Sequence, residues 1–466
     1  MGKRIPAVPR SRSFMDSRAM AHNPVQVLSK YTSLYGDTFR FYFGGVKEAI
    51  VTTNPVVIQH VLKTNWENYH KSHIQKKRMG HFLGKGLLTT EGEAWKTQRR
   101  LIQSGFERKQ LEVLSSIMQD SLAESLRDFD RQARIGPVDI YPVMMKMTFA
   151  MVGKSLFGAN LKEDDIDLIS EAILTVQEFM VRQTIQPYLN PWFAISGEQR
   201  RHEEMRSRAF GVLGDYIRRR REEEPGHDLL QILMDARYSD GTSMSDELVV
   251  SESMQLLVAG HETSSNALSW TLYLLSTRPD CVDRIRDEFD CVLGDKPLGF
   301  SDVPKFEFTT QVIMEALRLY PPFWMVDRVA VADDQIMDIP VPRGTIIVVF
   351  IYGAHHSSKF WSDPDRFIPD RFSKDSKKNH TPFSYLPFGG GPRGCIGGNY
   401  AMLQMLMILG AVVRRYDFEL AKDQNVSPRP MIILRSSNGI RMNFARRKHE
   451  PIQLHKPAAR AVSNSS

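Results

Sequence analysis

Cysteine is scarce in this sequence. Only Cys281, Cys291 and Cys395 occur among 466 residues. An odd number of cysteines at wide spacing excludes a disulfide framework, and it also excludes a zinc knuckle. A chain of this length can bury a large core without such crosslinks. At least one of the three cysteines therefore calls for another explanation.

Long hydrophobic runs are also missing. No apolar run approaches the ~18 to 20 residues that span a bilayer, and the longest, near residues 346–351, has the length of a strand. The N-terminus is basic but lacks the apolar core of a signal peptide. Gly2 begins a myristoylation-like sequence, but Pro6 stands where that motif needs Ser or Thr. We therefore expect a cytoplasmic protein without a transmembrane anchor.

The excess of positive charge is small for a chain of this length. The 61 basic and 54 acidic residues give a net charge of +7. The densest basic run, Arg218 to Arg221, is followed directly by three glutamates, so it indicates the solvated end of a helix. A nucleic-acid site needs a basic stripe interleaved with aromatic residues. The sequence therefore does not predict a nucleic-acid partner, although it allows docking of an acidic protein.

The pattern along the chain is mostly helical. Residues 38–52 predict a hairpin that turns at Gly44 and Gly45, and residues 344–350 predict another short strand. Helical periodicity dominates from about 55 to 320, with a helix of about 30 residues after Ser243, and a last long helix is expected near 397–416. We predict one mainly α domain with a minor β region over residues 1–447, followed by a flexible C-terminal tail at 448–466.

The glycine-rich stretch from Phe388 to Gly398 contains Cys395. Glycines let a backbone approach a bulky group closely, and a cysteine just before a helix is placed where a thiolate is favoured. These properties suit the proximal ligand of a haem iron, and Arg393 is close enough in sequence to reach a porphyrin propionate. A phosphate-binding loop is the first alternative, but no Gly-Lys-Ser/Thr follows. A simple buried cysteine is the second.

The pattern Phe-x-x-Gly-x-Arg-x-Cys-x-Gly, formed by Phe388, Gly391, Arg393, Cys395 and Gly397, resembles the haem-binding signature of the cytochrome P-450 superfamily. Three further motifs follow the order of that family, and the resemblance extends from about residue 20 to 447. It implies the P-450 fold, a haem-thiolate helical prism. It also implies haem b (iron protoporphyrin IX), with Cys395 as the metal ligand.

The second motif is Glu315-Ala-Leu-Arg318, in which an acid and an arginine share one helical face. The resemblance implies a structural network of Glu315, Arg318 and Arg371 behind the haem. The alternative is an ordinary surface pair, which contributes little to stability.

The third motif, Trp95-Lys-Thr-Gln-Arg99, places an indole N–H and a guanidinium one helical turn apart. In the family such donors bind the haem propionates, and Arg suits carboxylates through its paired donors. The resemblance adds Arg328 and Lys71 as further propionate ligands. For each of these basic residues, the alternative is a solvated side chain.

The fourth motif, Ala259-Gly-His-Glu-Thr-Ser264, lies within the longest predicted helix. A mid-helix glycine is costly, so Gly260 suggests a close neighbour. The resemblance implies that this face passes over the iron, with Thr263 and Glu262 as catalytic residues that deliver protons to dioxygen. We do not expect His261 to be a second iron ligand.

The implied reaction is monooxygenation, with electrons from NAD(P)H. The resemblance to members without a membrane anchor implies a separate ferredoxin- or flavodoxin-type partner with its reductase, and we expect a monomer. A basic helix surface at Lys96, Arg99 and Arg100 would receive that partner.

The expected substrate pocket is largely apolar, which favours hydroxylation of a lipid, fatty acid or terpenoid. By family position its residues are Phe82, Phe179, Leu256, Ala259, Phe323, Trp324 and Ser437. Oxidative O-demethylation of a sugar or aromatic methyl ether is one alternative, and a peroxide-driven peroxygenase is another. A haem carrier without catalytic activity would have no use for a proton relay.

Overall fold

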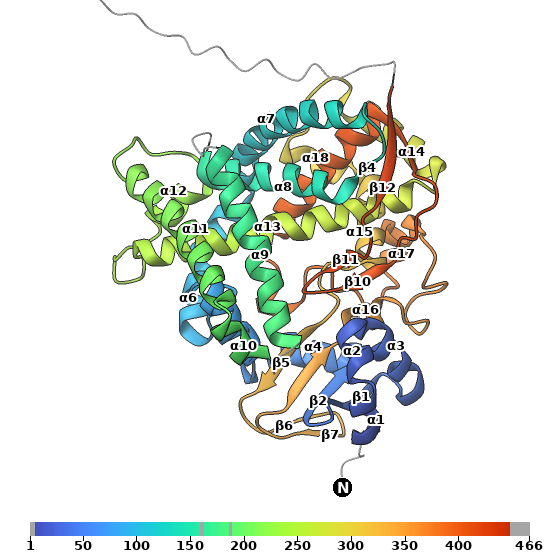
Figure 1. The fold of residues 1–466 in the computed structure, drawn as a ribbon. Coiled ribbons are helices and arrows are strands. Elements are labelled where there is room, and N and C mark those ends of the chain that lie inside the picture. The colour runs from blue at the N-terminus through green and yellow to red at the C-terminus, as the bar shows by residue number, and fades with distance from the viewer. Residues whose placement is uncertain (1–4, 159–162, 186–188, 448–466) are drawn as a thin grey trace, which may run out of the picture.

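A computed structural model describes residues 5–158, 163–185 and 189–447 (Figure 1). The expected tail at 448–466 lies outside these residues. Helices account for most of the described chain, as the sequence predicted. Their bounds are α1 (Arg10–Met15), α2 (Ser17–His22), α3 (Pro24–Tyr35), α4 (Pro55–Gln59), α5 (Gly80–Leu83), α6 (Gly92–Gln103), α7 (Arg108–Ala133), α8 (Ile140–Phe157), α9 (Glu163–Ile185), α10 (Asn190–Ile195), α11 (Glu198–Arg220), α12 (Leu229–Asp235), α13 (Asp246–Leu275), α14 (Pro279–Leu293), α15 (Glu307–Leu319), α16 (Ile351–His355), α17 (Lys374–Lys377) and α18 (Gly398–Arg415).

The strands form a small β region. The largest sheet has the order β1-β2-β8-β5-β3, in which β2 and β8 are parallel and the other pairs are antiparallel. Strand β12 lies between β4 and β9, and two hairpins, β6-β7 and β10-β11, complete the set. The bounds are β1 (Thr38–Phe43), β2 (Lys47–Thr52), β3 (Tyr69–His70), β4 (Val138–Asp139), β5 (Val326–Ala330), β6 (Asp334–Ile336), β7 (Ile339–Val341), β8 (Ile346–Val349), β9 (Tyr416–Leu420), β10 (Pro428–Pro430), β11 (Leu434–Ser436) and β12 (Arg441–Arg446).

Helix α13 is the long helix that the sequence predicted, and it runs through the main hydrophobic core. The hydroxyl of Ser245 accepts a hydrogen bond from the N–H of Leu248, which caps the first turn. Asp246 and Glu247 follow, where negative charge favours a helix N-terminus. Helix α13 packs along α8, so the centre of the molecule is a helix–helix interface (Figure 1).

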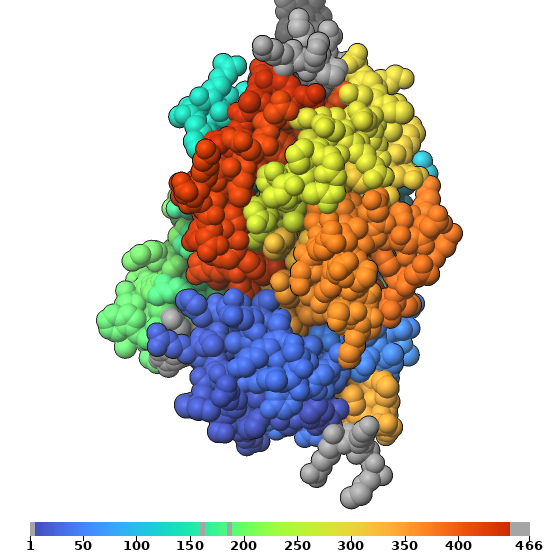
Figure 2. Space-filling model, turned by 90° about the vertical axis from the view of Figure 1, so that its right-hand side faces the viewer, coloured from blue at the N-terminus to red at the C-terminus, as the bar shows by residue number. Residues whose placement is uncertain are grey.

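Segments far apart in sequence meet around the β region. The N-terminal residues Val25, Leu28 and Phe41 share one buried cluster with Phe350 and Leu434. Figure 2 shows the same arrangement from outside, with the blue N-terminal segment directly below the orange and red segments. This packing attaches the hairpin β1-β2 and the helices before it to the C-terminal half of the chain. Among the described helices, none is both long and apolar enough to cross a membrane.

The strongly patterned elements match the prediction, whereas the shortest strands were missed. The hairpin β1-β2, strand β8 and helices α13 and α18 lie where they were expected. Strands β3 and β4 were not predicted, because each has only two residues and a two-residue strand shows no alternation in the sequence. Their partners, β5 and β12, come from distant parts of the chain.

Candidate active site

The glycine-rich stretch folds into a turn that presents Cys395 just before α18. The N–H of Cys395 donates to the carbonyl of Phe388 (2.8 Å), and the N–H of Gly394 donates to the carbonyl of Gly391 (3.0 Å). Gly391 has a φ of +66°, and a Cβ there would lie 1.9 Å from the carbonyl oxygen of Leu62. Position 391 therefore requires glycine, because the loop touches the backbone at Leu62.

The Cys395 thiol lies among groups with opposing effects on its charge. Burial raises the pKa of the Cys395 thiol, whereas the N–H of Gly397 and the positive charge of Arg99 lower it. The balance is a raised pKa for the thiol, even though the Cys395 residue is exposed at the surface of the loop. A bound ferric ion would supply the missing positive charge, because a metal-coordinated thiol is deprotonated. Arg99 donates to the carbonyl of Gly394 (2.8 Å), beside Cys395.

Three buried cations surround one buried acid next to this loop. We call Lys71, Arg328 and Arg393 the basic cluster, and the acid is Glu91. Arg393 contacts a carboxylate oxygen of Glu91 at 2.6 Å, and the backbone N–H of Lys71 donates to its other oxygen, also at 2.6 Å. Burial lowers the pKa of Lys71 to about 7, and burial with the neighbouring Arg393 lowers that of Arg328 to about 10. When all four groups are ionised, the set carries a net charge of +2, and two further acids act on it, Asp327 on Arg328 and Glu252 on Lys71.

The ring of Trp95 lies beside the basic cluster. Its centroid is 5.8 Å from Nζ of Lys71 and 5.4 Å from the guanidinium carbon of Arg393. The structure thus brings four of the predicted propionate ligands together, namely Trp95 and the three cations. Nε of Arg393 is buried and has no hydrogen-bond partner among the described residues. The net positive charge of this set and the free donor of Arg393 fit a buried dianion, and haem carries two propionates.

On α13, the predicted catalytic pair splits over two sides of the helix. The Thr263 hydroxyl is partly exposed and donates to the Ala259 carbonyl (2.8 Å). Glu262 is almost fully buried and forms an ion pair with Arg435 of β11, whose Nε lies 3.0 Å from its carboxylate. Arg435 was not predicted from the sequence. Thr263, Ala259 and Leu256 form the accessible face of this part of α13, whereas Ala267, one turn beyond Thr263, is buried in the core.

Gly260 and His261, the two residues before Glu262, face α8. A Cβ on Gly260 would lie 3.1 Å from Cγ2 of Val152, so the close neighbour that its presence suggested is a side chain of α8. His261 is fully buried, its Nδ1 lies 2.6 Å from the Leu257 carbonyl, and its ring meets Phe149 edge-on. His261 thus lies in the α8–α13 interface.

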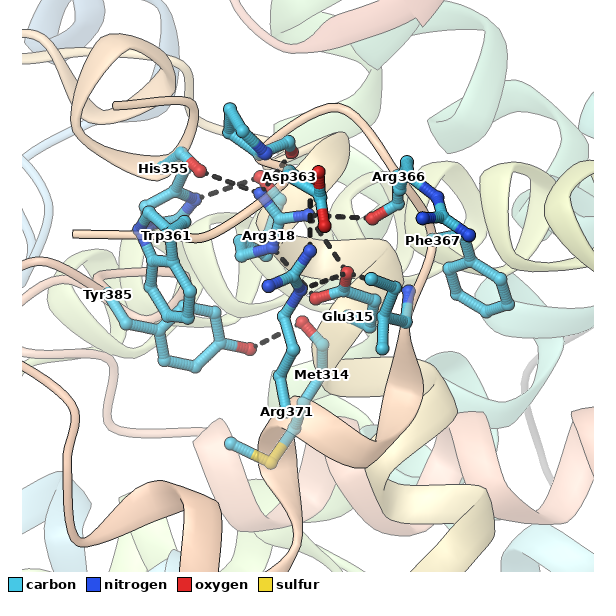
Figure 3. Close-up of polar contacts among 12 residues, drawn as sticks. Met314, Glu315, Arg318, His355, Trp361, Asp363, Arg366, Phe367, Arg371 and Tyr385 are labelled. Carbon is cyan, nitrogen blue, oxygen red and sulfur yellow. Dashed lines mark hydrogen bonds and ion pairs between the residues drawn. The ribbon is translucent and has the colours of Figure 1, made fainter. Parts of the chain in front are cut away.

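Glu315, Arg318 and Arg371 form one buried network (Figure 3). Glu315 and Arg318 are both fully buried on α15, and two N–O distances between them measure 2.7 and 2.8 Å. Arg371 reaches the same carboxylate at 3.2 Å. Arg318 also donates to the carbonyls of His355 and Pro364, each at 2.7 Å. The network therefore attaches α15 to the irregular segment at residues 355–371.

The residues assigned to the substrate pocket do not form one group. Phe82 and Phe179 belong to one apolar cluster with Val176, Met180 and Phe193. Trp324 instead packs in the buried cluster that contains Val25, Leu28 and Phe350. Its indole N–H donates to the Met431 carbonyl (2.9 Å), and its ring meets that of Phe350. Phe323 is 47% exposed, and the Ser437 hydroxyl bonds to that of Ser427.

The expected basic docking surface is smaller than its sequence suggested. Lys96 lies between Glu67 and Glu93, at 2.8 and 3.0 Å. Arg99 faces the Cys395 loop, and only Arg100 of the three is exposed. Among the described residues, no group of three or more His, Cys, Asp or Glu side chains could hold a metal ion. A single thiolate is all that a haem iron needs from this side.

Comparisons with known proteins agree with this geometry. A family model described as Cytochrome P450 matches residues 8–444. The chain is 30% identical over 406 residues to the protein LUTEIN DEFICIENT 5, chloroplastic, of Arabidopsis thaliana, covering 83% of this chain and 68% of that protein. It is 28% identical to pentalenene oxygenase of Streptomyces avermitilis (88% and 90% covered) and to an ultra-long-chain fatty acid omega-hydroxylase of Homo sapiens (86% and 80% covered). With its loop cysteine, buried basic cluster and family match over nearly its whole length, the chain belongs to the cytochrome P450 family of haem-dependent monooxygenases.

Proposed function

We propose that residues 1–447 form one haem domain that hydroxylates an apolar lipid, fatty acid or terpenoid. Cys395 would bind the haem iron, and Trp95 with the basic cluster would hold the propionates. Phe388, Gly391 and Gly397 would shape the loop around the thiolate, and Arg99 would steady that loop through Gly394. When bound, the haem supplies the oxidising chemistry of R–H + O₂ + 2 e⁻ + 2 H⁺ → R–OH + H₂O.

The protein's part is to move protons and to exclude water. The Thr263 hydroxyl already donates to the Ala259 carbonyl, so its oxygen lone pairs are left to accept a hydrogen bond from a water or from the reacting group. Glu262 is paired with Arg435, so its carboxylate has to exchange that partner for water before it can pass a proton inward. Leu256 and Ala259 line the same accessible face with apolar atoms, which favours an apolar substrate near Thr263.

The observation that carries the substrate class is an apolar cluster near this part of α13. Phe82 of α5 packs with Phe179 and Phe193, and the carbonyl of the next residue, Leu83, accepts from Gln255 of α13 at 3.3 Å. Phe82 of the apolar cluster is therefore adjacent in sequence to a residue that contacts α13, the helix that bears Leu256. The relatives' names point the same way, since they describe a pentalenene oxygenase and a fatty acid hydroxylase.

Electrons would come from NAD(P)H through a separate ferredoxin- or flavodoxin-type partner and its reductase. Arg100, exposed on α6 one residue from Arg99, offers a basic contact for an acidic partner. Turnover with peroxide alone, without any electron donor, would instead favour the peroxygenase alternative.

A spectral screen followed by product analysis tests the proposal. The purified haem protein is titrated with fatty acids, terpenoids and methyl ethers, and each compound that shifts the haem absorption is then incubated with a redox system. Hydroxylation gives a product with one oxygen atom more than the substrate, whereas O-demethylation gives a product without the methyl group and releases formaldehyde. We expect hydroxylated lipids or terpenoids. Turnover of methyl ethers alone would favour the demethylase alternative.

A further inference from the structure

Glu91 is a buried acid that belongs to none of the four sequence motifs. Its side chain is 9% exposed and the Arg393 side chain that it contacts is 6% exposed. The two residues are 302 positions apart in the sequence. Glu91 directly precedes α6, yet its carboxylate does not cap that helix. It contacts Arg393 and the backbone of Lys71 instead.

The hydrogen bonds around Arg393 leave one side of its guanidinium free. One terminal nitrogen donates to the carbonyls of Trp66 (2.8 Å) and Tyr69 (2.9 Å). The other donates to Glu91 at 2.6 Å. Of the five N–H groups that an arginine carries, these contacts use three and fix the plane of the group. Nε, buried and without a partner among the described residues, points its N–H elsewhere.

Lys71 is oriented in a similar way. Its Nζ donates to the carbonyls of Leu87 (2.7 Å) and Thr90 (2.8 Å), which uses two of its three N–H groups. Its backbone N–H is bound to Glu91. The negative charge of Glu91 also opposes the effect of burial, which lowers the pKa of Lys71 to about 7. Glu91 thus helps to keep Lys71 charged and in place.

We propose that Glu91 is a positioning residue that orients Arg393 and Lys71 toward the haem propionates and, through its charge, lowers the midpoint potential of the haem. The inference depends on the proposed haem site at Cys395. Without Glu91, three buried cations would face two propionates. One-electron reduction of ferric haem adds a negative charge, which an excess of buried positive charge favours because such charges interact strongly at low dielectric.

Two substitutions separate the charge of Glu91 from its reach. Glu91→Gln keeps a carbonyl oxygen that accepts from Arg393 or Lys71 but removes the charge. Glu91→Asp keeps the charge but shortens the side chain by one methylene, so it cannot reach both donors. Glu93→Gln is the matched control, because Glu93 lies two residues away, is 84% exposed and pairs only with the surface residue Lys96 among the described residues.

The experiment is a potentiometric titration of each purified haem protein with dithionite and mediator dyes. We expect a more positive midpoint potential for Glu91→Gln, and potentials close to that of the wild type for Glu91→Asp and Glu93→Gln. An unchanged potential in haem-loaded Glu91→Gln would overturn the electrostatic role. Wild-type protein that binds no haem would refute the proposed function instead, so the two failures are distinct.

The rate of haem release to apomyoglobin measures the positioning role. This measurement needs only Glu91→Asp, so it can be made even if Glu91→Gln fails to load haem. We expect Glu91→Asp to release haem several-fold faster than the wild type, because Arg393 loses a fixed contact. Release at the wild-type rate would overturn the positioning role. The Glu93→Gln control should release haem as slowly as the wild type.

Discussion

Glu315 and Arg318 are fully buried charges that depend on each other. Removing one partner of a buried pair leaves an uncompensated charge, which costs about 3 to 5 kcal/mol. A surface pair of the same spacing contributes under about 1 kcal/mol. The predicted i,i+3 spacing was visible in the sequence, but burial decides which value applies, and no pattern in the sequence reports it.

Glu315→Ala is therefore expected to lower the free energy of unfolding by about 3 to 5 kcal/mol and to reduce the yield of haem-loaded protein. Glu307→Ala is the matched control, because Glu307 lies on the same helix and pairs at the surface with Lys374. Chemical denaturation and haem content are the measurements. Equal stability of the two variants would contradict a structural role for the network.

The role proposed for Thr263 depends on one hydroxyl on the accessible face of α13. Thr263→Ala should leave haem binding nearly unchanged, because the side chain is small and its hydroxyl donates to a carbonyl of its own helix. The variant should consume NAD(P)H while forming less product and more hydrogen peroxide. Thr263→Ser, which retains the hydroxyl, should restore most of the coupling. The ratio of product to NAD(P)H decides, and an unchanged ratio in Thr263→Ala would remove this residue from the proton route.

At the scale of elements, two side chains of α13 hold the connection between α5 and α6. Glu252 accepts from the N–H of Leu87 (3.0 Å), and Gln255 accepts from the N–H of Leu88 (2.8 Å). Gln255 also donates to the Gly84 carbonyl at 3.1 Å. The connection lies so close that a Cβ on Gly86 would fall 2.6 Å from the Gln255 side chain. The segment between α5 and α6 is thus fixed on the long helix.

Glu252 makes this attachment depend on pH. Burial raises its pKa from 4.5 to about 7. A raised folded-state pKa contributes stability that is fully present below about pH 4.5 and is lost as pH rises through 7. Between pH 5 and 8 the wild type should therefore lose about 2 to 3 kcal/mol relative to Glu252→Gln, which stays neutral. Glu247→Gln, at an exposed site on the same helix, should show no such trend. Denaturation curves across this range are the check, and parallel pH profiles for wild type and Glu252→Gln would contradict it.

The sequence predicted elements better than contacts between them. Helix α13 could be located because Ser245 caps it and its pattern is long. Arg435 could not be linked to Glu262, because 173 residues separate the two and no local pattern around either residue indicates the other. The same holds for Glu91, because its partner Arg393 is 302 positions away in the sequence. Trp324 was placed in the pocket by family position, but its packing depends on N-terminal residues that only the tertiary structure brings to it.

At the scale of the whole molecule, distant segments meet around Cys395. The basic cluster combines residues before α6, on β5 and in the cysteine loop, and the Glu315 network fixes the irregular segment between α16 and α17. The three cysteines differ in setting, since Cys281 is buried in the helical core and Cys291 is exposed on the same helix. Only Cys395 lies in a glycine-rich loop with an arginine two residues before it.

The most direct test of a haem-thiolate site at Cys395 is the absorption spectrum of the reduced, CO-bound protein. The wild type and Cys291→Ser are expected to show the red-shifted band that thiolate ligation produces. Cys395→Ser is expected to lose that band and monooxygenase activity, even where some haem is retained. A thiolate-type band that persists in Cys395→Ser would contradict the account, because one of the other two cysteines would then have to be the ligand.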